Sequence, residues 1–250
     1  MAPDKINSVI VLDVEGKEDI SDPPLIDNSV DIFIDKINIP VKTNRQNVEI
    51  HYTIDGTTPT IKSPITKGTI TISDCALVSA RCFRNGKPVS GTSSATFTKD
   101  FPAKAEIVNN PANGLKYSYY EGNWDVLPKF SELTPKKQGI LENFLFTPKV
   151  ENEYFGFEYS GYIRIPKAAV YTFYLDSDDG SQLFIGDKLV VDNDGLHGSK
   201  EKKGLIALAE SFHSIRVKYF NKTGGLSLKV QIEGAGMKKQ LIQNEMLFFN

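Results

Sequence analysis

Two adjacent aspartates, Asp178 and Asp179, are the residues whose type and spacing most clearly permit chemistry. They follow an apolar-alternating run at residues 170–175, so they are expected where a strand ends and a loop begins. Neighbouring carboxylates repel one another unless they share a positive charge, and carboxylate oxygens in a loop suit a hard cation such as calcium. Calcium held in this way can bind vicinal sugar hydroxyls through its open coordination positions. An Asp-Asp-Gly sequence is equally typical of a strand-end turn, so the pair alone leaves both interpretations open.

A second polar segment, residues 192–198 (DNDGLHG), could act beside such a cation. The side chains of Asp192, Asn193, Asp194 and His197 could hydrogen-bond sugar hydroxyls. The alternative is a polar hairpin loop in which the Asp and Asn side chains satisfy the local backbone. Both interpretations stay open at this level.

The sequence gives little support for catalysis. It has no Gly-x-Ser-x-Gly nucleophile elbow, and its three histidines lie in separate segments without metal-ligand spacing. Glycoside hydrolysis needs two carboxylates roughly 5–9.5 Å apart across a cleft, whereas Asp178 and Asp179 are adjacent. We expect no catalytic residue in this chain. Tyr119, Tyr120 and Trp124 could stack on a sugar ring, but we expect Trp124 to belong to the core.

The elements that position these residues are predicted to be β-strands in two modules. In the second module, residues 105–250, alternating apolar residues predict strands at 161–166, 215–219 and 226–232, and Gly186-Asp187 predicts a compact hairpin. Short helices are expected only at residues 131–144 and around Ala207. The pattern indicates an antiparallel β-barrel or sandwich.

The first module, residues 30–99, has the same character. Strands are predicted at residues 48–54 and 70–72, and Asn85-Gly86 is a strong two-residue hairpin signal. Residues 1–29 are interpreted as the end of a preceding domain or a linker, and residues 100–104 as a second linker. The predicted fold class is all-β: a small β-sandwich followed by an antiparallel β-barrel or sandwich.

Composition narrows the function classes. The net charge of -2 over 250 residues gives no electrostatic case for nucleic acid, and no run approaches the roughly 20 apolar residues of a membrane helix. The polar start at residues 1–5 is not a signal peptide, so the chain is either cytosolic or a piece of a longer secreted protein. Cys75 and Cys82 fall within one predicted strand, about 23 Å apart when extended, so we expect two buried thiols rather than a disulfide.

Several ordered motifs in the second module carry a family resemblance. Residues 119–124 (YYEGNW), 161–166 (GYIRIP), 171–181 (YTFYLDSDDGS) and 192–195 (DNDG) together resemble the PA-14 (PA14) domain. That family occurs in glycosidases, adhesins and toxins, and many members bind carbohydrate. The resemblance covers nearly all of residues 105–250.

The resemblance implies a ligand set for calcium. In carbohydrate-binding PA14 adhesins the paired aspartates are joined by a cis peptide and coordinate calcium with an asparagine on a neighbouring loop and with backbone carbonyls. Here this implies Asp178 and Asp179 with Asn221, and the carbonyls of Thr223 and Gly225. Residues 224–225 (GG) depart from the bulkier residues that the adhesins carry at this place, which puts the sugar specificity in doubt.

Two further resemblances suggest the context of the chain. Residues 51–60 (HYTIDGTTPT) resemble the chitobiase/β-hexosaminidase C-terminal-type domain, a module appended to secreted glycoside hydrolases, and residues 7–16 resemble the last strand after the catalytic barrel of α-L-fucosidases. They imply a non-catalytic, carbohydrate-binding region of a secreted glycoside hydrolase, extracellular or periplasmic, with a glycan and the parent catalytic domain as partners. The alternative is a structural module that packs against the parent's catalytic domain and shapes its active site without binding sugar.

Overall fold

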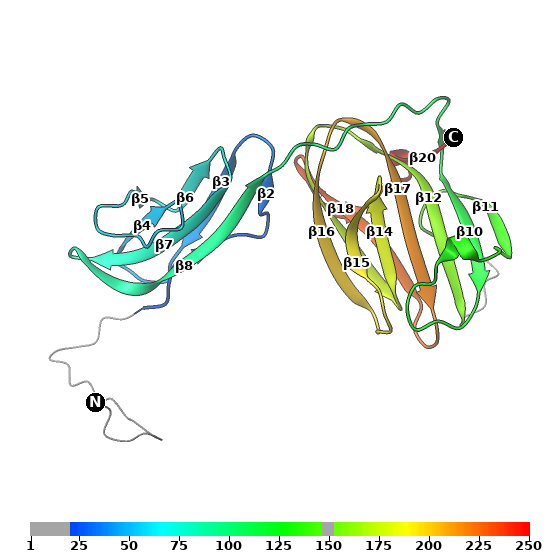
Figure 1. Ribbon diagram of the computed structural model, residues 1–250, viewed down its shortest axis with the longest axis horizontal. Helices are drawn as coiled ribbons and strands as arrows, with labels where there is room; N and C mark the ends of the chain where they lie inside the picture. Colours follow the sequence, from blue (N-terminus) through cyan, green and yellow to red (C-terminus); the bar gives the residue numbers. More distant parts are fainter. Residues whose placement is uncertain (1–20, 147–152) are drawn as a thin grey trace, which may run out of the picture. The chain divides into compact units, whose positions relative to one another are not determined.

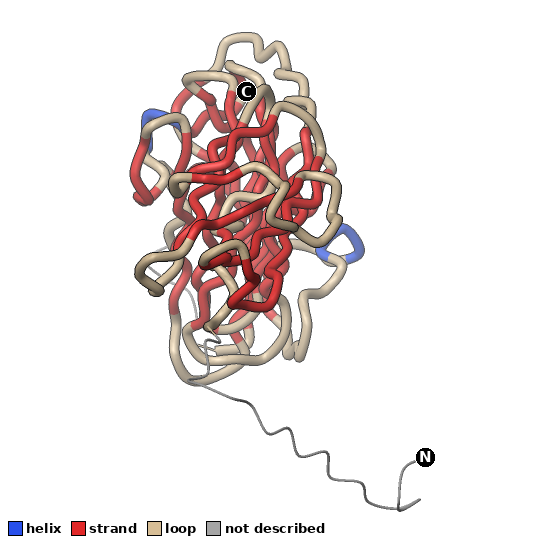
Figure 2. Tube along the Cα trace, turned by 90° about the vertical axis from the view of Figure 1, so that its left-hand side faces the viewer, coloured by secondary structure: helices blue, strands red, loops and turns tan. Residues whose placement is uncertain are grey.

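The computed structural model describes residues 21–146 and 153–250, and strands dominate both parts of it (Figures 1 and 2). The predicted all-β class is confirmed. The chain divides into two compact units: the first takes in residues up to Ser29 together with Ile37–Phe97, and the second Val30–Lys36 together with Thr98–Asn250. The predicted strand at residues 7–16 lies outside the described residues.

The first unit consists of two short sheets. One sheet has the order β1 (Leu25–Ile26), β3 (Ile37–Lys42) and β6 (Thr69–Ile72). The other has the order β8 (Lys87–Lys99), β7 (Ala76–Arg84), β4 (Glu49–Thr53) and β5 (Ile65–Thr66). The last residues of β8, from Thr98 on, pair in parallel with β2 (Ile32–Phe33), and both segments belong to the second unit.

Local sequence explains the turns of the first unit. The predicted Asn85-Gly86 hairpin is confirmed, since both residues have positive φ between β7 and β8. The expectation for the cysteines is half wrong: Cys82 is buried in β7, but Cys75 precedes that strand and is exposed. Neither cysteine forms a disulfide.

The second unit is a sandwich of an eight-stranded and a four-stranded sheet (Figure 1). The larger sheet has the order β11-β10-β12-β17-β14-β15, with β20 paired to β12 and β9 paired to β20. Its strands are β9 (Ala112–Asn113), β10 (Leu115–Glu121), β11 (Lys137–Leu141), β12 (Phe155–Ile165), β14 (Ser181–Ile185), β15 (Lys188–Asn193), β17 (Ser211–Asn221) and β20 (Leu247–Phe249). The smaller sheet has the order β16 (Lys200–Leu208), β13 (Ala169–Asp178), β18 (Ser227–Gly234) and β19 (Met237–Leu241).

The core of the second unit lies between the two sheets and is rich in aromatic side chains. Period-two alternation turns Phe155, Phe157 and Tyr159 of β12 inward, opposite Tyr171 and Phe173 of β13, and all five are fully buried in one cluster. Burial of each large apolar side chain contributes roughly 1.5–3 kcal/mol. The core therefore fixes the strand ends from which the loops at the ends of the sandwich start.

The predicted helices are wrong apart from one turn. Within residues 131–144 only the short 3-10 segment Phe130–Glu132 has helical geometry, while Lys137–Leu141 forms β11 and pairs antiparallel with β10. Pro135 and Gly139 disfavour a helix there, and pairing with a strand edge supplies the backbone hydrogen bonds instead. Ala207 lies in β16, which pairs with β13. Within the described residues no helix has the length and apolar character needed to cross a membrane.

A candidate cation site at one end of the second sandwich

Three connections cross from one sheet to the other at the same end of the second unit. They join β13 to β14, β15 to β16 and β17 to β18, and each links a strand of one sheet with a strand of the other. The end is the one to which the arrowhead of β17 points, at the bottom of Figure 1. Residues that are distant in sequence therefore meet there.

The paired aspartates form the first of these connections. Asp178 is the last residue of β13, Asp179 is buried, and the peptide bond between them is cis, as the family resemblance implies. Gly180 follows so closely against the next loop that a Cβ on it would lie 2.9 Å from Asp194 Oδ1. The first two connections are therefore packed directly on one another.

The carboxylate of Asp179 is bound by the backbone of both other connections. Oδ1 accepts a hydrogen bond from the His197 N–H at 3.1 Å, and Oδ2 accepts one from the Lys222 N–H at 2.9 Å. A carboxylate has about four acceptor sites, so these two bonds leave each oxygen able to accept further interactions. Asp179 thus ties the three connections together and retains the capacity to bind a cation.

The carboxylate of Asp178 lies in a less favourable environment for its charge. Burial, and next the charge of Asp179, raise the pKa of Asp178 above its ordinary value of 3.8. The glycine on the β17–β18 loop, Gly225, comes so close that a Cβ on it would lie 2.2 Å from Asp178 Oδ2. A cation at this place would offset the repulsion between the two carboxylates.

A core tyrosine holds the main chain at the pair. The hydroxyl of Tyr219, fully buried in β17, donates a hydrogen bond to the carbonyl oxygen of Asp178. Burial, then the charges of Asp178 and Asp179, raise the pKa of this phenol, so it stays a proton donor. Sequence alternation predicts the strand that carries Tyr219, but it gives no sign of this contact.

The other predicted metal ligands lie on the β17–β18 connection. Asn221 is the last residue of β17 and is fully buried, opposite Phe155 of β12. Thr223 and Gly225 follow in the exposed loop, and Gly225 is the one in direct proximity to Asp178. The structure thus brings Asp178, Asp179 and Gly225 together, with Asn221 at the base of the same loop.

The predicted sugar-contacting residues separate into exposed and buried ones. Asp192 is exposed on β15, where its Oδ1 accepts hydrogen bonds from Gln182 Nε2 at 3.1 Å and from the Asp194 N–H at 3.3 Å. Asn193 is fully buried and donates through Nδ2 to Ser177 Oγ at 3.2 Å and to the Lys200 carbonyl at 2.8 Å. Asn193 therefore holds the β15–β16 loop from inside and presents no side chain to a bound sugar.

Asp194 and His197 fix the shape of the same loop. Asp194 Oδ1 accepts hydrogen bonds from the Leu127 and Gly195 N–H groups, both at 2.8 Å. His197 Nε2 lies 2.9 Å from the carbonyl oxygen of Asn193, and its Nδ1 lies 2.9 Å from that of Gly198. Asp194 therefore also anchors the β10–β11 connection to this end of the sandwich.

The charge around the site is balanced partly by one lysine. Lys222 Nζ forms an ion pair of 2.6 Å with Asp125, and this hydrogen bond raises the pKa of the lysine. Its ammonium group is thus directed to Asp125 rather than to the aspartate pair.

Among the residues that the structure describes, no three His, Cys, Asp or Glu side chains gather as metal ligands. The candidate set consists instead of two carboxylates with amide and carbonyl oxygens, which is the ligand chemistry that calcium takes.

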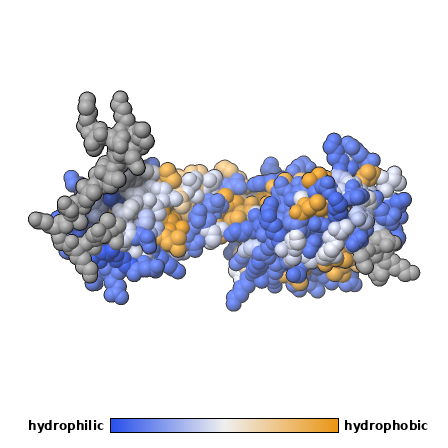
Figure 3. Space-filling model, turned by 90° about the horizontal axis from the view of Figure 1, so that it is seen from below, coloured by the Kyte–Doolittle hydropathy of each residue, from blue (hydrophilic) through white to orange (hydrophobic). Residues whose placement is uncertain are grey.

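The surface around the site is mostly hydrophilic, with small hydrophobic areas, as Figure 3 shows from the side of these loops. Exposed apolar side chains on the surrounding loops are Val126, Leu196 and Leu226. Tyr119 and Tyr120 are buried, and Trp124 is half-buried with its ring 6.2 Å from that of Phe130 in an edge-on arrangement. The two tyrosines are therefore core residues, and Trp124 covers the edge of that core.

Residues that the sequence analysis missed act mainly through their backbone. The N–H of Lys222 carries no side-chain signature, so nothing in the sequence pointed to its bond with Asp179. The close approach of Gly225 to Asp178 could have been inferred from the sequence, because a glycine in a loop often marks close contact of the main chain with another group. The sequence analysis predicts only the carbonyl of Gly225 as a ligand.

Comparisons with known families agree with this architecture. The model of the PA14 domain matches residues 111–245. A second family model, described as Fn3 associated, matches residues 39–97, and the predicted likeness of this region to chitobiase C-terminal-type domains stays a prediction. No curated protein matches the chain.

Several solved structures are similar to part of the chain. The PA14 domain of the antifreeze protein MpAFP is 17% identical with a TM-score of 0.47, covering 59% of this chain and 96% of its own. The PA14 sugar-binding domain from an RTX adhesin is 14% identical with a TM-score of 0.48, covering 55% and 99%. The epithelial adhesin 9 A domain from Candida glabrata, in complex with Galβ1-3GlcNAc, is 12% identical with a TM-score of 0.47, covering 59% and 94%.

Proposed function

The chain belongs to the PA14 domain family through residues 111–245, and from this premise we propose that its second unit binds a glycan through a calcium ion at Asp178 and Asp179. The observation that carries the proposal is the environment of this carboxylate pair. Both side chains meet at the crossing of three loops, and the pKa of Asp178 is raised by burial and by the charge of Asp179. A site that disfavours two negative charges favours a divalent cation between them.

The donor set fits calcium rather than a transition metal. Asp178 and Asp179 would supply carboxylate oxygens and Asn221 an amide oxygen, while Thr223 and Gly225 would supply main-chain carbonyls. All are hard oxygen donors, whereas zinc and copper sites generally contain histidine or cysteine. The missing Cβ at Gly225 lets the loop lie directly against Asp178 Oδ2, where any larger residue would displace the carboxylate. Bound calcium would offer open coordination positions to vicinal sugar hydroxyls.

The surrounding residues have distinct roles in this proposal. The N–H groups of His197 and Lys222 orient the carboxylate of Asp179, so little reorganisation accompanies ion binding. Asp192 is exposed beside the loop and is the side chain of its segment best placed to accept a hydrogen bond from a sugar hydroxyl. Asp194 and His197 shape the loop, and Asn193 supports it from the interior.

We extend the proposal to the wider protein on the sequence resemblances alone. The second unit would act as a non-catalytic module of an extracellular or periplasmic glycoside hydrolase and raise the local concentration of the parent enzyme on its polymer. In the structural alternative, the same unit packs against the parent's catalytic domain and shapes its active site, without binding sugar itself.

Calorimetric titration of the chain with calcium tests the metal site. We expect saturable binding to the wild type and none to Asp178→Asn, which keeps the size of the side chain and removes its charge. Asp187→Asn is the matched control, because Asp187 is an exposed carboxylate in the hairpin at the other end of β14 and β15. Heatless traces for the wild type, or unchanged binding to Asp178→Asn, would refute the metal site.

A glycan array then tests sugar binding with calcium and with EDTA. Binding that appears only with calcium supports the proposal, whereas silence in both conditions supports the structural alternative. Equal binding in both conditions would place the sugar elsewhere on the chain.

A further inference from the structure

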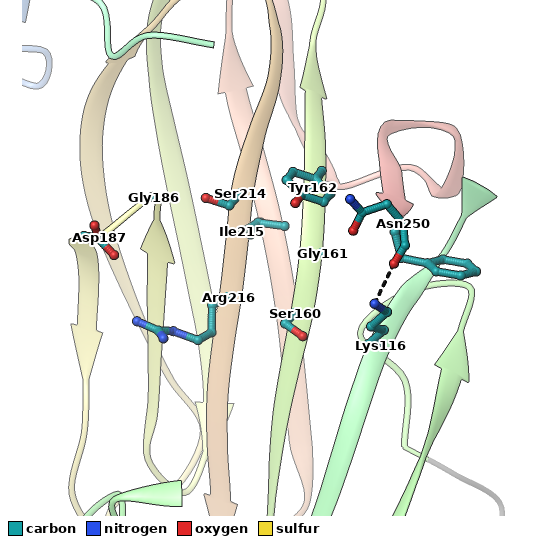
Figure 4. A pocket seen from close by; sticks show the side chains of 11 residues that line it. Lys116, Ser160, Gly161, Tyr162, Gly186, Asp187, Ser214, Ile215, Arg216 and Asn250 are labelled. Carbon is teal, nitrogen blue, oxygen red and sulfur yellow. Dashed lines mark hydrogen bonds between the residues drawn. The ribbon is translucent and has the colours of Figure 1, made fainter. Parts of the chain in front are cut away.

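A second pocket lies on the outer face of the eight-stranded sheet, remote from the aspartate pair. It has a volume of about 340 Å³ and lies over β10, β12, β17 and the β14–β15 hairpin (Figure 4). Figure 4 shows Arg216 and Asp187 on one side of it and Lys116 and Asn250 on the other. Its lining also includes Ser160, Gly161, Tyr162, Gly186, Ser214, Ile215 and Phe249.

Strand register places the two cationic residues of this pocket in one row. Lys116 of β10 is opposite Ser160 of β12, Ser160 is opposite Arg216 of β17, and Arg216 is opposite Phe184 of β14. Adjacent strands lie about 4.8 Å apart, so Lys116 and Arg216 stand roughly 10 Å apart with the small Ser160 between them. Lys116 Nζ donates a hydrogen bond of 2.5 Å to the main-chain oxygen of Asn250, which also lines the pocket (Figure 4). Arg216 and this lysine therefore flank a floor that can admit a ligand ring.

Arg216 is arranged to bind an anionic group. Its guanidinium carbon lies 4.7 Å from the centre of the Phe184 ring, a cation–π contact that holds the group over the sheet. Its Nε is buried and has no hydrogen-bond partner within the described part of the chain. Lys218 Nζ lies 5.5 Å from the centre of the same ring, but Lys218 does not line the pocket. Because Nε is closed to solvent, an anion in the pocket would meet the terminal N–H groups of the guanidinium.

The remaining lining suits a hydroxylated ring. Ser160 and Tyr162 carry hydroxyl groups, and the exposed carboxylate of Asp187 can accept hydrogen bonds. The hydroxyl of Ser214 donates to Glu106 Oε1 at 2.6 Å, so its oxygen can still accept a hydrogen bond. The aromatic rings of Tyr162 and Phe249 offer apolar surface of the kind that packs against a sugar face. A ligand with both a carboxylate and several hydroxyls would bind the cationic residues through the first and the hydroxyl and carboxylate side chains through the second.

We propose that this outer pocket is a second saccharide site, selective for a sugar residue that carries a carboxylate, which is bound by Arg216. Its choice of a sugar rests on the proposed function, while its preference for an anion rests on Arg216, with Lys116 across the floor of the pocket. The site needs no calcium, because its anchoring charges are side-chain cations. It therefore acts independently of the aspartate pair.

NMR titration of the full chain in EDTA tests the proposal, with galacturonate, galactose and inorganic sulfate as probes. Galacturonate differs from galactose by its carboxylate, so we expect shifts in the amides of Gly161, Gly186 and Ser214 with galacturonate and at least tenfold weaker effects with galactose. Sulfate supplies the charge without the ring and should also bind at least tenfold more weakly. Equal binding of galactose would refute the anion preference, and equal binding of sulfate would refute a saccharide site.

The variant Arg216→Gln should weaken galacturonate binding at least tenfold. Arg164→Gln is its control, because Arg164 lies over the Phe212 ring at 5.9 Å in the same sheet but does not line this pocket. Unperturbed amide positions elsewhere in the spectrum will show that both variants fold. Unchanged binding to Arg216→Gln would overturn the proposal. Because all titrations contain EDTA, which removes calcium, they report binding at this pocket separately from binding at the calcium site.

Discussion

Gly225 and Asp178 are so close that the glycine has no room for a side chain: a Cβ would stand 2.2 Å from the Asp178 Oδ2 atom. The contact joins the β17–β18 loop to the end of β13, so main chain rather than side chain forms one wall of the candidate cation site. A side chain at position 225 would therefore displace Asp178, although the adhesins that the sequence resembles carry bulkier residues at this place.

The substitution Gly225→Ala should therefore act directly on the site. We expect it to displace the carboxylate of Asp178, to weaken calcium binding at least tenfold and to reduce the free energy of unfolding by about 1–3 kcal/mol. Gly198→Ala is the control, since no atom lies within 4 Å of a Cβ at that loop glycine. Calorimetry and urea denaturation measure the two quantities. Equal calcium affinity in both variants would contradict the close contact.

The raised pKa of Asp178 predicts a pH dependence for the calcium-free protein. A carboxyl whose pKa is raised on folding binds its proton more tightly in the folded state, so its contribution to stability is complete below 3.8 and is lost as the pH rises through the folded-state pKa. Asp178→Asn lacks this loss. In EDTA we expect the variant to melt at a higher temperature than the wild type at pH 7.

The difference in melting temperature between Asp178→Asn and the wild type should shrink as the pH falls below 3.8, where the aspartate is protonated in both folded and unfolded chains. With excess calcium the order should reverse, because only the wild type gains free energy from ion binding. A variant that melts below the wild type in EDTA at pH 7 would contradict the electrostatic account.

Tyr219 offers a test of how the core supports the site. Tyr219→Phe removes the donor to the Asp178 carbonyl oxygen and should reduce the free energy of unfolding by about 1–3 kcal/mol. It should also weaken calcium binding, since the main chain at the pair loses its fixed position. Tyr171→Phe is a matched control, because that buried hydroxyl donates to the Lys167 carbonyl at 2.8 Å, away from the site. Equal calcium affinity in the two variants would show that Tyr219 only stabilises the fold.

The strands and turns were largely predictable because their causes are local. Alternation placed β4, β12, β17 and β18, and the pairs Asn85-Gly86 and Gly186-Asp187 marked hairpins that the structure contains. The secondary-structure predictions were wrong where pairing with a neighbouring strand decides the conformation. Lys137–Leu141 has little intrinsic strand character, and it becomes β11 because β10 offers it an open edge.

The site was predictable in its side chains and not in its backbone contacts. The adjacent carboxylates and the family motifs pointed to Asp178 and Asp179, and the cis peptide between them is present. The donors from His197 and Lys222 to Asp179 could not be predicted, because every residue has an N–H group and only the fold selects two of them. The burial of Asn193 was missed for a related reason: a polar residue in a loop segment is expected to be exposed unless its hydrogen-bond partners are known.

Asn193 and its neighbour Asp192 separate structural support from ligand contact. Asn193→Ala removes the donors to Ser177 Oγ and to the Lys200 carbonyl, so we expect a loss of about 1–3 kcal/mol in the free energy of unfolding. Asp192→Ala changes an exposed side chain and should alter stability by less than about 0.5 kcal/mol. The two substitutions lie one position apart on β15, so each is the control of the other.

For sugar binding, the order of the two substitutions should be reversed, so that Asp192→Ala has the larger effect. Under saturating calcium, at a temperature where both variants are folded, Asp192→Ala should weaken binding of any glycan identified on the array, because a hydroxyl partner is lost. Asn193→Ala should leave that affinity close to the wild-type value, because its side chain faces the interior. Urea denaturation and calorimetry with the same glycan supply both readouts. If Asn193→Ala instead abolished sugar binding while remaining folded, the buried side chain would have to be assigned a direct part in shaping the ligand-binding surface.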